Sequence, residues 1–221
     1  MLPTVDELLQ FFHEYEEIEK HGFKLPHWQQ PGACYFLTFR LADSIPRQLL
    51  DKWEDDREAW LKQHPPPWTP ELEQEYHERF SRQIEHWLDQ AHGECVFREP
   101  EIAEILAQVL LFHDGAEGRY QIHSFVIMPN HVHGLFSLHP DYRLEDCLKN
   151  WKGISARHIN QLLGREGNTL WQRNYFDRLI RNAHHFTAVA RYIRRNPAKA
   201  NLSPGSYHLY ESDLVKNLLD A

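Results

Sequence analysis

Hydrophobic and polar residues alternate in four stretches of the chain, and this pattern predicts β-strands. The stretches are residues 33–41, 120–128, 131–138 and 171–180. They are rich in aromatic and β-branched residues, as is typical of strands that bury at least one face. Only Pro129 and Asn130 separate the second stretch from the third, so we expect these two strands to form a hairpin.

Five other stretches are predicted to be helices from their apolar spacing, their charge and the residues at their ends. They are residues 46–63, 71–92, 100–113, 144–163 and 184–196. Pro70 and Pro100 stand where a helix begins, a position that tolerates proline. We expect the last helix to end at Asn196, because Pro197 disfavours helical geometry in the residue before it.

The order of these elements predicts the fold class. A strand is followed by helices, two strands, a helix, a strand and a helix. This order is typical of an α+β domain with a mostly antiparallel sheet and helices on one face. We expect one catalytic domain over residues 1–221, with residues 44–98 as an inserted acidic helical hairpin.

Length and composition place the chain among ordinary globular proteins. It has 221 residues, of which 42% are hydrophobic and 25% are charged. This composition excludes wholesale disorder, and the length suffices for a core without disulfide bonds. The cysteines Cys34, Cys95 and Cys147 lie far apart in the sequence, the first twenty residues lack the features of a secretory signal, and no apolar stretch could span a bilayer. We therefore expect a soluble, cytoplasmic protein without a membrane partner.

The charge is distributed unevenly along the chain. The formal net charge is −8, which by itself argues against a nucleic-acid partner. However, residues 1–120 carry a net charge of −13, whereas residues 143–200 carry +8. Such a basic segment is compatible with binding to nucleic acid, although a block of charge also solvates a helix face. Its acidic counterpart could steer DNA onto one face by repelling it elsewhere.

Two histidines directly after the predicted hairpin turn form a candidate metal site. Residues i and i+2 of a strand project to the same face, so the imidazoles of His131 and His133 lie together. Paired neutral imidazoles are natural ligands of a divalent cation. The pair alone is weak evidence, because a chain with 16 histidines contains such a triplet by chance. Packed or surface histidines are the alternative interpretation.

The last predicted helix offers further members of a site. Tyr192 and Asn196 are four residues apart and therefore share a helix face. The amide oxygen of Asn196 is a reasonable third ligand for a hard cation, and the phenol of Tyr192 can attack as a phenolate when a cation lowers its pKa. The alternative is a core tyrosine on an amphipathic helix beside solvent-exposed arginines.

The joint order of these motifs resembles a known family. The relevant segments are HSFVIMPNHVHGLF, LWQRNYFDRLIRN and ARYIRRNPAKANL, in that order, preceded by HWQQPGACYFLTFRLADSIP near the start. They resemble the single-tyrosine HUH transposases, and within these the REP-associated tyrosine transposases. The resemblance extends from about residue 23 to 202 and is weakest over residues 43–100. It implies a ferredoxin-like α+β fold with the histidines on a central strand.

The resemblance also implies roles for individual residues. His131 and His133 match the pair that holds a Mg²⁺ or Mn²⁺ ion, Tyr192 matches the nucleophile, and Asn196 matches the residue that completes the metal site. Related enzymes carry glutamine or histidine at the last position, so the shorter asparagine changes the reach of this ligand. The implied chemistry is a 5′-phosphotyrosine intermediate and a free 3′-hydroxyl.

Basic residues of the C-terminal half are candidates for contacts with single-stranded or hairpin DNA from repeat elements. They are Lys152, Arg157, Arg173, Arg178, Arg181, Arg194, Arg195 and Lys199. Aromatic residues lie between several of them, as in proteins that bind single strands. Tyr175 lies among them and is a rival nucleophile, but it lacks a carboxamide or histidine four residues later.

Three functions follow as hypotheses. The first is a metal-dependent, single-stranded DNA endonuclease and strand transferase that acts at hairpin-forming repeats, in the cytoplasm and associated with the nucleoid. The second is a hairpin-DNA-binding protein that derives from a transposase and has lost catalysis. The third is an unrelated metallohydrolase with a water nucleophile. The sequence leaves open whether the protein is a monomer or a homodimer.

Overall fold

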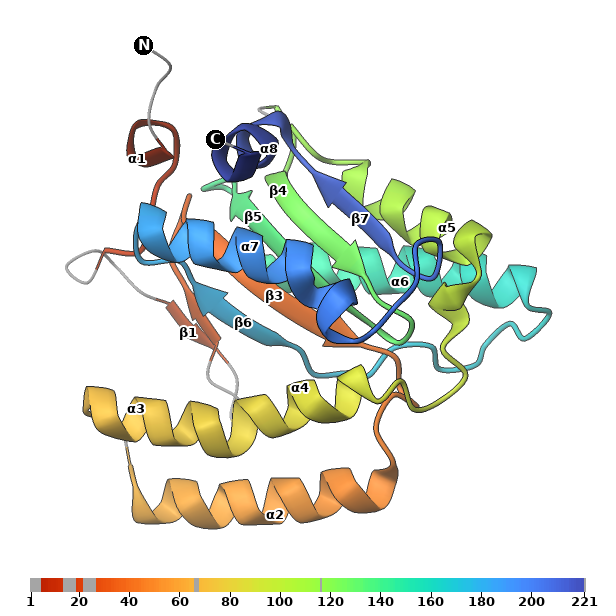
Figure 1. Cartoon of the computed structure of the whole chain (residues 1–221), viewed down its shortest axis with the longest axis horizontal. Helices are drawn as coiled ribbons and strands as arrows, with labels where there is room; N and C mark the ends of the chain where they lie inside the picture. Colours follow the sequence, from red (N-terminus) through yellow and green to blue (C-terminus); the bar gives the residue numbers. More distant parts are fainter. Residues whose placement is uncertain (1–4, 14–18, 22–26, 66–67, 116, 221) are drawn as a thin grey trace.

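A five-stranded antiparallel sheet forms the centre of the computed structural model, which describes residues 5–13, 19–21, 27–65, 68–115 and 117–220. The strand order is β6-β3-β5-β4-β7 (Figure 1). The strands are β3 (Cys34–Arg40), β4 (Tyr120–Ile127), β5 (His131–Leu138), β6 (Phe176–Leu179) and β7 (His208–Glu211). A separate two-stranded sheet pairs β1 (Glu19–His21) with β2 (His27–Gln29), and a short helix α1 spans Val5–Leu8. The predicted α+β class is confirmed.

Two crossover helices connect the strands of the large sheet. Helix α5 (Pro100–Leu111) precedes the β4–β5 hairpin, and α6 (Leu144–Leu162) leads from β5 to β6. The chain order β3-α5-β4-β5-α6-β6, with β3 between β5 and β6, is that of the ferredoxin-like fold. The histidine pair therefore lies on the central strand β5, as the resemblance implies.

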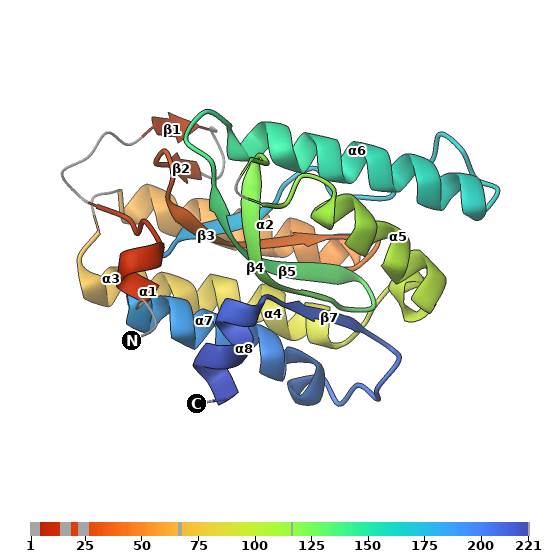
Figure 2. The same cartoon turned by 90° about the horizontal axis from the view of Figure 1, so that it is seen from above.

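Helices cover both faces of the sheet, whereas the sequence predicted helices on one face. Helices α5 and α6 lie on one side, and α7 (Ala183–Lys199) and α8 (Asp213–Asp220) lie on the other (Figure 2). Tyr35 and Leu37 of β3 belong to the core beneath α5 and α6, while Phe36 belongs to the core beneath α7. The prediction was wrong because β3 carries apolar side chains on both faces, and both faces must be buried.

A helical hairpin, defined here as residues 47–89, lies between β3 and α5 in the sequence and beside the edge of the sheet in space (Figure 1). It consists of α2 (Arg47–Gln63), α3 (Pro70–Tyr76), a π-helical turn (His77–Ser81) and α4 (Arg82–Asp89). Trp60, Tyr76 and Phe80 form one of its apolar clusters. The single helix predicted over 71–92 is thus interrupted by the wider turn and ends earlier. A 3₁₀ turn (Val96–Arg98) leads on to α5.

Two other predicted boundaries differ from the structure, and two elements near the C-terminus were not predicted. Helix α7 continues through Pro197 to Lys199, because Asn196 and Pro197 are buried and their carbonyl groups accept hydrogen bonds from the N–H groups of Ala200 and Leu202. The strand predicted over 171–180 is regular only in β6. Strand β7 and helix α8 were not predicted, since their segments are short and lack a long periodic pattern.

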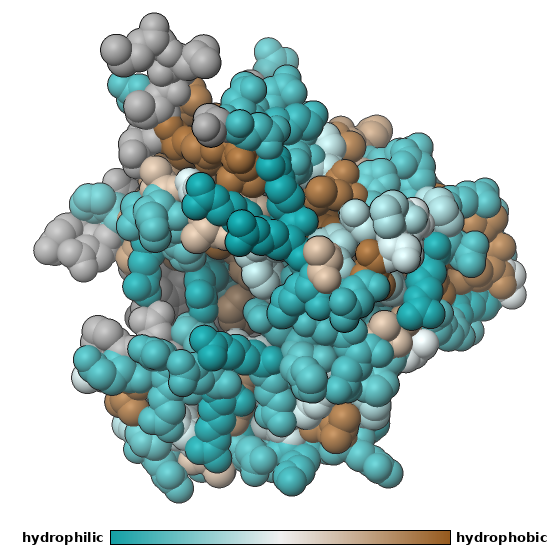
Figure 3. All heavy atoms as spheres, in the orientation of Figure 1, coloured by the Kyte–Doolittle hydropathy of each residue, from teal (hydrophilic) through white to brown (hydrophobic). Residues whose placement is uncertain are grey.

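The face that carries α7 and the helical hairpin is mainly hydrophilic (Figure 3), and the cysteines lie in the interior. Hydrophilic side chains cover most of the face that carries α7 and the helical hairpin (Figure 3). Within the ranges described, no helix combines the length and the apolarity needed to cross a membrane. Cys34, Cys95 and Cys147 are buried and form no disulfide bond.

Candidate active site

The two histidines of β5 face each other beneath helix α7. His131 and His133 are 1% and 2% exposed, and their Nε2 atoms lie 3.2 Å apart. Both point to the α7 face because they are two residues apart on one strand. Val132 between them points to the opposite face and belongs to the core beneath α5 and α6. The alternation of the strand thus brings two ring nitrogens to one point.

Neighbouring side chains fix the orientation of each imidazole. The Asn130 amide donates through Nδ2 to the carbonyl oxygen of His92 (3.1 Å), so its Oδ1 faces His131. His131 Nδ1 lies 2.8 Å from this Oδ1, and it must therefore donate. His133 Nδ1 lies 2.7 Å from Thr38 Oγ1, because the β3–β5 register places Thr38 opposite His133. These contacts leave the Nε2 of His131 as a lone-pair donor, as in metal-binding histidines.

Both imidazoles are neutral at physiological pH. Burial, together with the smaller effect of the nearby Lys199 ammonium, lowers the pKa of His131 to about 3. Burial, His131 and Lys199 also hold the pKa of His133 well below its usual value. When His133 Nδ1 donates to Thr38 Oγ1, the Nε2 lone pairs of both histidines converge, and they repel each other unless a cation lies between them. Their chemistry therefore fits a divalent cation.

Tyr192 on α7 lies directly over this pair. Its hydroxyl is 3.4 Å from His133 Nε2, and its ring makes an edge contact with Phe36 at a centroid distance of 5.8 Å. The helix is held in place by Phe186, Ala190 and Ile193, which are buried against the sheet. The helical spacing of these three residues sets the direction in which Tyr192 points.

Asn196 lies one turn beyond Tyr192 on the same helix. It is 1% exposed, and among the residues that the structure describes neither its Oδ1 nor its Nδ2 has a partner with regular hydrogen-bond geometry, although the amide lies close enough to the Tyr192 hydroxyl to affect its pKa. Such an unsatisfied amide deep in a protein needs a partner. Within the described ranges, no third histidine, cysteine or carboxylate joins the pair to form a metal-binding group. The amide oxygen of Asn196 is therefore the candidate third protein ligand for a cation at His131 and His133.

Two carboxylates from the helical hairpin reach the same site, and no sequence motif marked either of them. Glu85 of α4 lies within hydrogen-bonding reach of the Tyr192 hydroxyl. Lys199 Nζ is 3.0 Å from Asp89 Oδ2 and 4.0 Å from Glu85 Oε2. Lys199 also lies 5.9 Å from the centre of the Tyr192 ring. Residues 43–100, over which the resemblance to the transposases is weakest, therefore contribute side chains to the site.

These surroundings keep Tyr192 protonated. Burial raises the pKa of its phenol well above the ordinary value, and the negative charges of Glu85 and Asp89 raise it further. The neighbouring Asn196 amide opposes this increase. Burial likewise raises the pKa of Glu85, while Lys199 opposes that change. A positive charge at the histidine pair would stabilise the phenolate, because the phenol oxygen is so close to His133.

The predicted DNA-binding residues fall into three groups. Arg157, Arg173, Arg181 and Arg195 are exposed on the surface. Arg178 contacts the imidazole of His77 in the helical hairpin, and Lys199 contacts Asp89, so these two lie where the hairpin meets the site. Lys152 and Arg194 are half-buried and are engaged with other groups of the protein.

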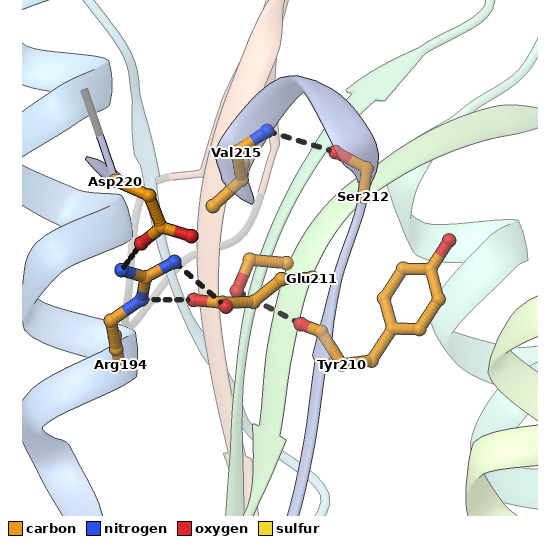
Figure 4. A network of polar contacts seen from close by, with 7 residues as sticks. Arg194, Tyr210, Glu211, Ser212, Val215 and Asp220 are labelled. Atoms are coloured by element: carbon orange, nitrogen blue, oxygen red, sulfur yellow. Dashed lines mark hydrogen bonds and ion pairs between the residues drawn. The ribbon is translucent and has the colours of Figure 1, made fainter. Parts of the chain in front are cut away.

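Lys152 and Arg194 have structural partners. The Lys152 ammonium donates to the carbonyl oxygens of Gln172 (2.9 Å), Arg173 (3.1 Å) and Asn174 (3.4 Å), and burial lowers its pKa to about 8. Its position explains why residues 172–174 do not continue strand β6. Arg194 binds Glu211 at 2.8 Å and Asp220 at 2.5 Å, and so ties α7 to β7 and α8 (Figure 4).

Tyr175, the rival nucleophile, has a different environment. Lys152 Nζ lies 5.6 Å from the centre of its ring, and the residue packs against the core beneath α5 and α6. Burial and the charges of Asp177 and Glu145 raise the pKa of its phenol. This core lies on the face of the sheet opposite the histidine pair.

Comparison with known proteins gives one family match. Residues 96–196 match the model of the IS200-like transposases, and this segment contains all four candidate site residues, His131, His133, Tyr192 and Asn196. The family resemblance seen in the sequence is thereby confirmed for this segment. No protein of curated function matches the chain.

Two solved structures are similar to the chain at low identity. One is a REP-associated tyrosine transposase bound to a REP hairpin, with 13% identity, a TM-score of 0.44, and coverage of 80% of this chain and 73% of the other. The second is a putative transposase from Deinococcus radiodurans, with 14% identity, a TM-score of 0.30, and coverage of 85% and 98%. The roles of the site residues therefore depend on the geometry of the chain itself.

Proposed function

We propose that this chain, whose residues 96–196 match the model of the IS200-like transposases, is a metal-dependent single-stranded DNA endonuclease and strand transferase with Tyr192 as its nucleophile. One observation carries the proposal: the Tyr192 hydroxyl lies 3.4 Å from Nε2 of a buried histidine whose partner imidazole is 3.2 Å away. A nucleophile beside a cation site is the arrangement that phosphoryl transfer requires.

Each residue of the site has a distinct role in the proposed reaction. His131, His133 and Asn196 would hold a Mg²⁺ or Mn²⁺ ion, and the bound ion would polarise the scissile phosphate and offset the charge of the transition state. The Tyr192 oxygen forms a bond to phosphorus, and its proton leaves to solvent or a neighbouring base. The bond from phosphorus to the 3′-oxygen breaks, and the leaving oxygen takes up a proton to become a free 3′-hydroxyl.

The covalent intermediate allows strand transfer. After cleavage, the 5′ side of the DNA is bound to Tyr192 through a phosphodiester. Another 3′-hydroxyl can attack this phosphodiester, release the tyrosine and join two strands without an external energy source. Cleavage and joining thus use the same residues in opposite directions.

Single-stranded and hairpin DNA from repeat elements is the proposed substrate. The net charge of +8 over residues 143–200 supports a polyanionic partner, and Arg173, Arg181 and Arg195 are exposed on the segments around the site. A half-buried tyrosine beside the helical hairpin is more accessible to one flexible strand than to a rigid duplex. We place this activity in the cytoplasm, at the nucleoid.

A covalent-adduct assay tests the proposal. The protein is incubated with labelled hairpin oligonucleotides that carry single-stranded flanks, with Mn²⁺ or with EDTA, and is then separated under denaturing conditions. We expect an adduct with Mn²⁺ only, its loss in Tyr192→Phe, and its retention in the control Tyr175→Phe. DNA binding without any adduct would contradict the proposal and support the non-catalytic alternative.

A further inference from the structure

A cavity of about 120 Å³ lies between the helical hairpin and the edge of the sheet, next to the candidate active site. The sheet side contributes residues of β3, β6 and the segment before β6, and the hairpin side contributes residues of α2, α3, the π-helical turn and α4.

Two lining residues are shared with the active site. Thr38 lines the cavity and contacts His133 Nδ1 at 2.7 Å. Glu85 lines it from the opposite wall and reaches the Tyr192 hydroxyl. A group inside the cavity is therefore directly beside the nucleophile and the histidine pair. A strand whose phosphate lies at Tyr192 has its neighbouring nucleoside at the mouth of the cavity.

The walls suit a flat aromatic ring. Trp53, Tyr76 and Phe176 supply aromatic surface, and Gln172 and Asn174 offer amide groups that donate and accept hydrogen bonds. Ligand pockets typically combine apolar walls with a few polar groups that read one edge of the ligand. The volume is of the same order as the cavity of about 150 Å³ that holds a benzene molecule in a protein core.

The polar wall is held in position before any ligand arrives. The Lys152 ammonium donates to the carbonyl groups of Gln172 and Asn174, which fixes the backbone that carries both amides. On the hairpin side, Trp53 donates through Nε1 to the carbonyl oxygen of Phe80 at 3.2 Å. A pocket that is ordered in advance loses less entropy on binding.

The cavity wall carries charges of both signs, whereas the groups just outside it are cationic. Glu54 and Glu85 place carboxylates on the wall, and Arg40 places a guanidinium there that interacts with the charge of Glu54. The cationic groups Arg178 and Lys199 lie where the hairpin meets the site, at His77 and Asp89 respectively. A nucleotide would therefore keep its phosphate near Arg178 and Lys199 and insert its uncharged base into the cavity, where Arg40 already has an acidic neighbour.

We propose that this cavity binds one unpaired nucleobase of the single strand, adjacent to the scissile phosphate. The inserted helical hairpin then supplies half of a base-binding pocket. Stacking on its aromatic residues and hydrogen bonds to Gln172 and Asn174 hold the base, as in enzymes that extrude a nucleotide from a stack. The inference rests on the proposed function, because it takes single-stranded DNA as the substrate.

Scanning with abasic nucleotides tests the pocket separately from catalysis. A fluorescent hairpin oligonucleotide with single-stranded flanks carries one abasic site at a time, and its Kd is measured by anisotropy. One stacked base is worth about 1–3 kcal/mol, so we expect one flanking position at which the abasic site weakens binding at least fivefold. The scan is repeated with two variants that fill the cavity from opposite walls, Ser81→Phe and Asn174→Phe.

We expect the filled variants to lose the sensitivity at that position, with a change of less than twofold between the normal and the abasic strand. The control Gln83→Phe places the same ring on an exposed position of the hairpin and should retain the wild-type pattern. Equal abasic penalties in the filled variants and the wild type, or no sensitive position at all, would overturn the proposal. Failure of the proposed function shows itself differently, as the absence of a Tyr192 adduct in the wild type.

Discussion

Lys199 Nζ lies 3.0 Å from Asp89 Oδ2, and this ion pair joins the end of the helix that carries Tyr192 to the inserted helical hairpin. The Asp89 side chain is 18% exposed and that of Lys199 is 50% exposed. The same carboxylate raises the pKa of Tyr192. A basic residue beside the nucleophile is thus paired with an acid of the hairpin, at the place where a phosphate of the DNA is expected to bind.

Asp89→Asn should strengthen DNA binding, because it releases the Lys199 ammonium for a phosphate and removes a negative charge from the DNA path. We expect the Kd for a single-stranded flank to fall severalfold at low salt, and the dependence on salt to become steeper by about one phosphate contact. Anisotropy titrations at several salt concentrations measure both quantities. Asp51→Asn, which changes the same charge in the exposed Arg47 pair on α2, is the matched control; equal effects of the two variants would contradict a local role for Asp89.

Thr38→Val should weaken metal binding without unfolding the protein. The substitution preserves the shape of the side chain but removes the group that contacts His133 Nδ1. Loss of such an outer contact typically costs 10–100-fold in metal affinity, so we expect a decrease in Mn²⁺ affinity of about that size. Calorimetric titration with Mn²⁺ measures it, and Thr38→Ser should restore most of the affinity. Unchanged Mn²⁺ binding in Thr38→Val would show that Thr38 does not orient the ligand.

Arg194 and Arg195 are adjacent, but we expect replacement of Arg194 to affect stability and replacement of Arg195 to affect DNA binding. Arg194→Gln should lower the free energy of unfolding by about 1–3 kcal/mol, because it leaves Glu211 without its charged partner. DNA affinity should change little. Arg195 is exposed, so Arg195→Gln should weaken DNA binding and reduce the salt dependence by about one contact, with little effect on stability. Urea unfolding measures the stability of both variants, and anisotropy measures their DNA affinity. A loss of DNA affinity in Arg194→Gln alone would show that Arg194, and not Arg195, contacts DNA.

Buried His123 should make the protein less stable in acid. Burial lowers the pKa of this imidazole in the folded protein to about 4, from the ordinary 6.5. The unfolded chain therefore binds a proton between pH 6.5 and pH 4 that the folded chain does not. The contribution of His123 to the free energy of unfolding is therefore complete above pH 6.5. It is lost as the pH falls towards 4, by up to ~1.4 kcal/mol per pH unit. Urea unfolding at pH 7, 6 and 5 should show this loss, and His123→Phe should reduce the slope. An identical slope in the variant would mean that other groups cause the acid sensitivity.

Four of the five strands of the large sheet and the four candidate site residues could be predicted because local patterns determine them. The boundaries of β5 match the predicted strand, and the spacing of His131 and His133 on it already places both imidazoles on one face. Asn196 and Tyr192 are likewise related by one helical turn. The placement of α7 on the second face could have been anticipated from Phe36, since an apolar residue between Tyr35 and Leu37 shows that both faces of β3 are buried.

Contacts between distant segments could not be predicted. Glu85 and Asp89 lie on a helix whose sequence indicates only an amphipathic, acidic surface, and their approach to Tyr192 depends on how the hairpin packs beside the sheet. The partnership of Arg194 with Glu211 and Asp220 depends on β7 and α8, which the sequence pattern did not reveal. Lys152 appeared as one of several basic residues, and only the fold shows that three carbonyl groups surround it.

The identity of the residue that becomes joined to DNA tests the central claim most directly. Protein treated with a hairpin oligonucleotide and Mn²⁺ is digested with nuclease and trypsin, and the modified peptide is sequenced by mass spectrometry. Cleavage after Arg191 and Arg194 yields a short peptide that contains Tyr192. We predict that this tyrosine carries a nucleotide through its 5′-phosphate. A nucleotide on Tyr175, or cleaved DNA with no modified peptide, would contradict the account.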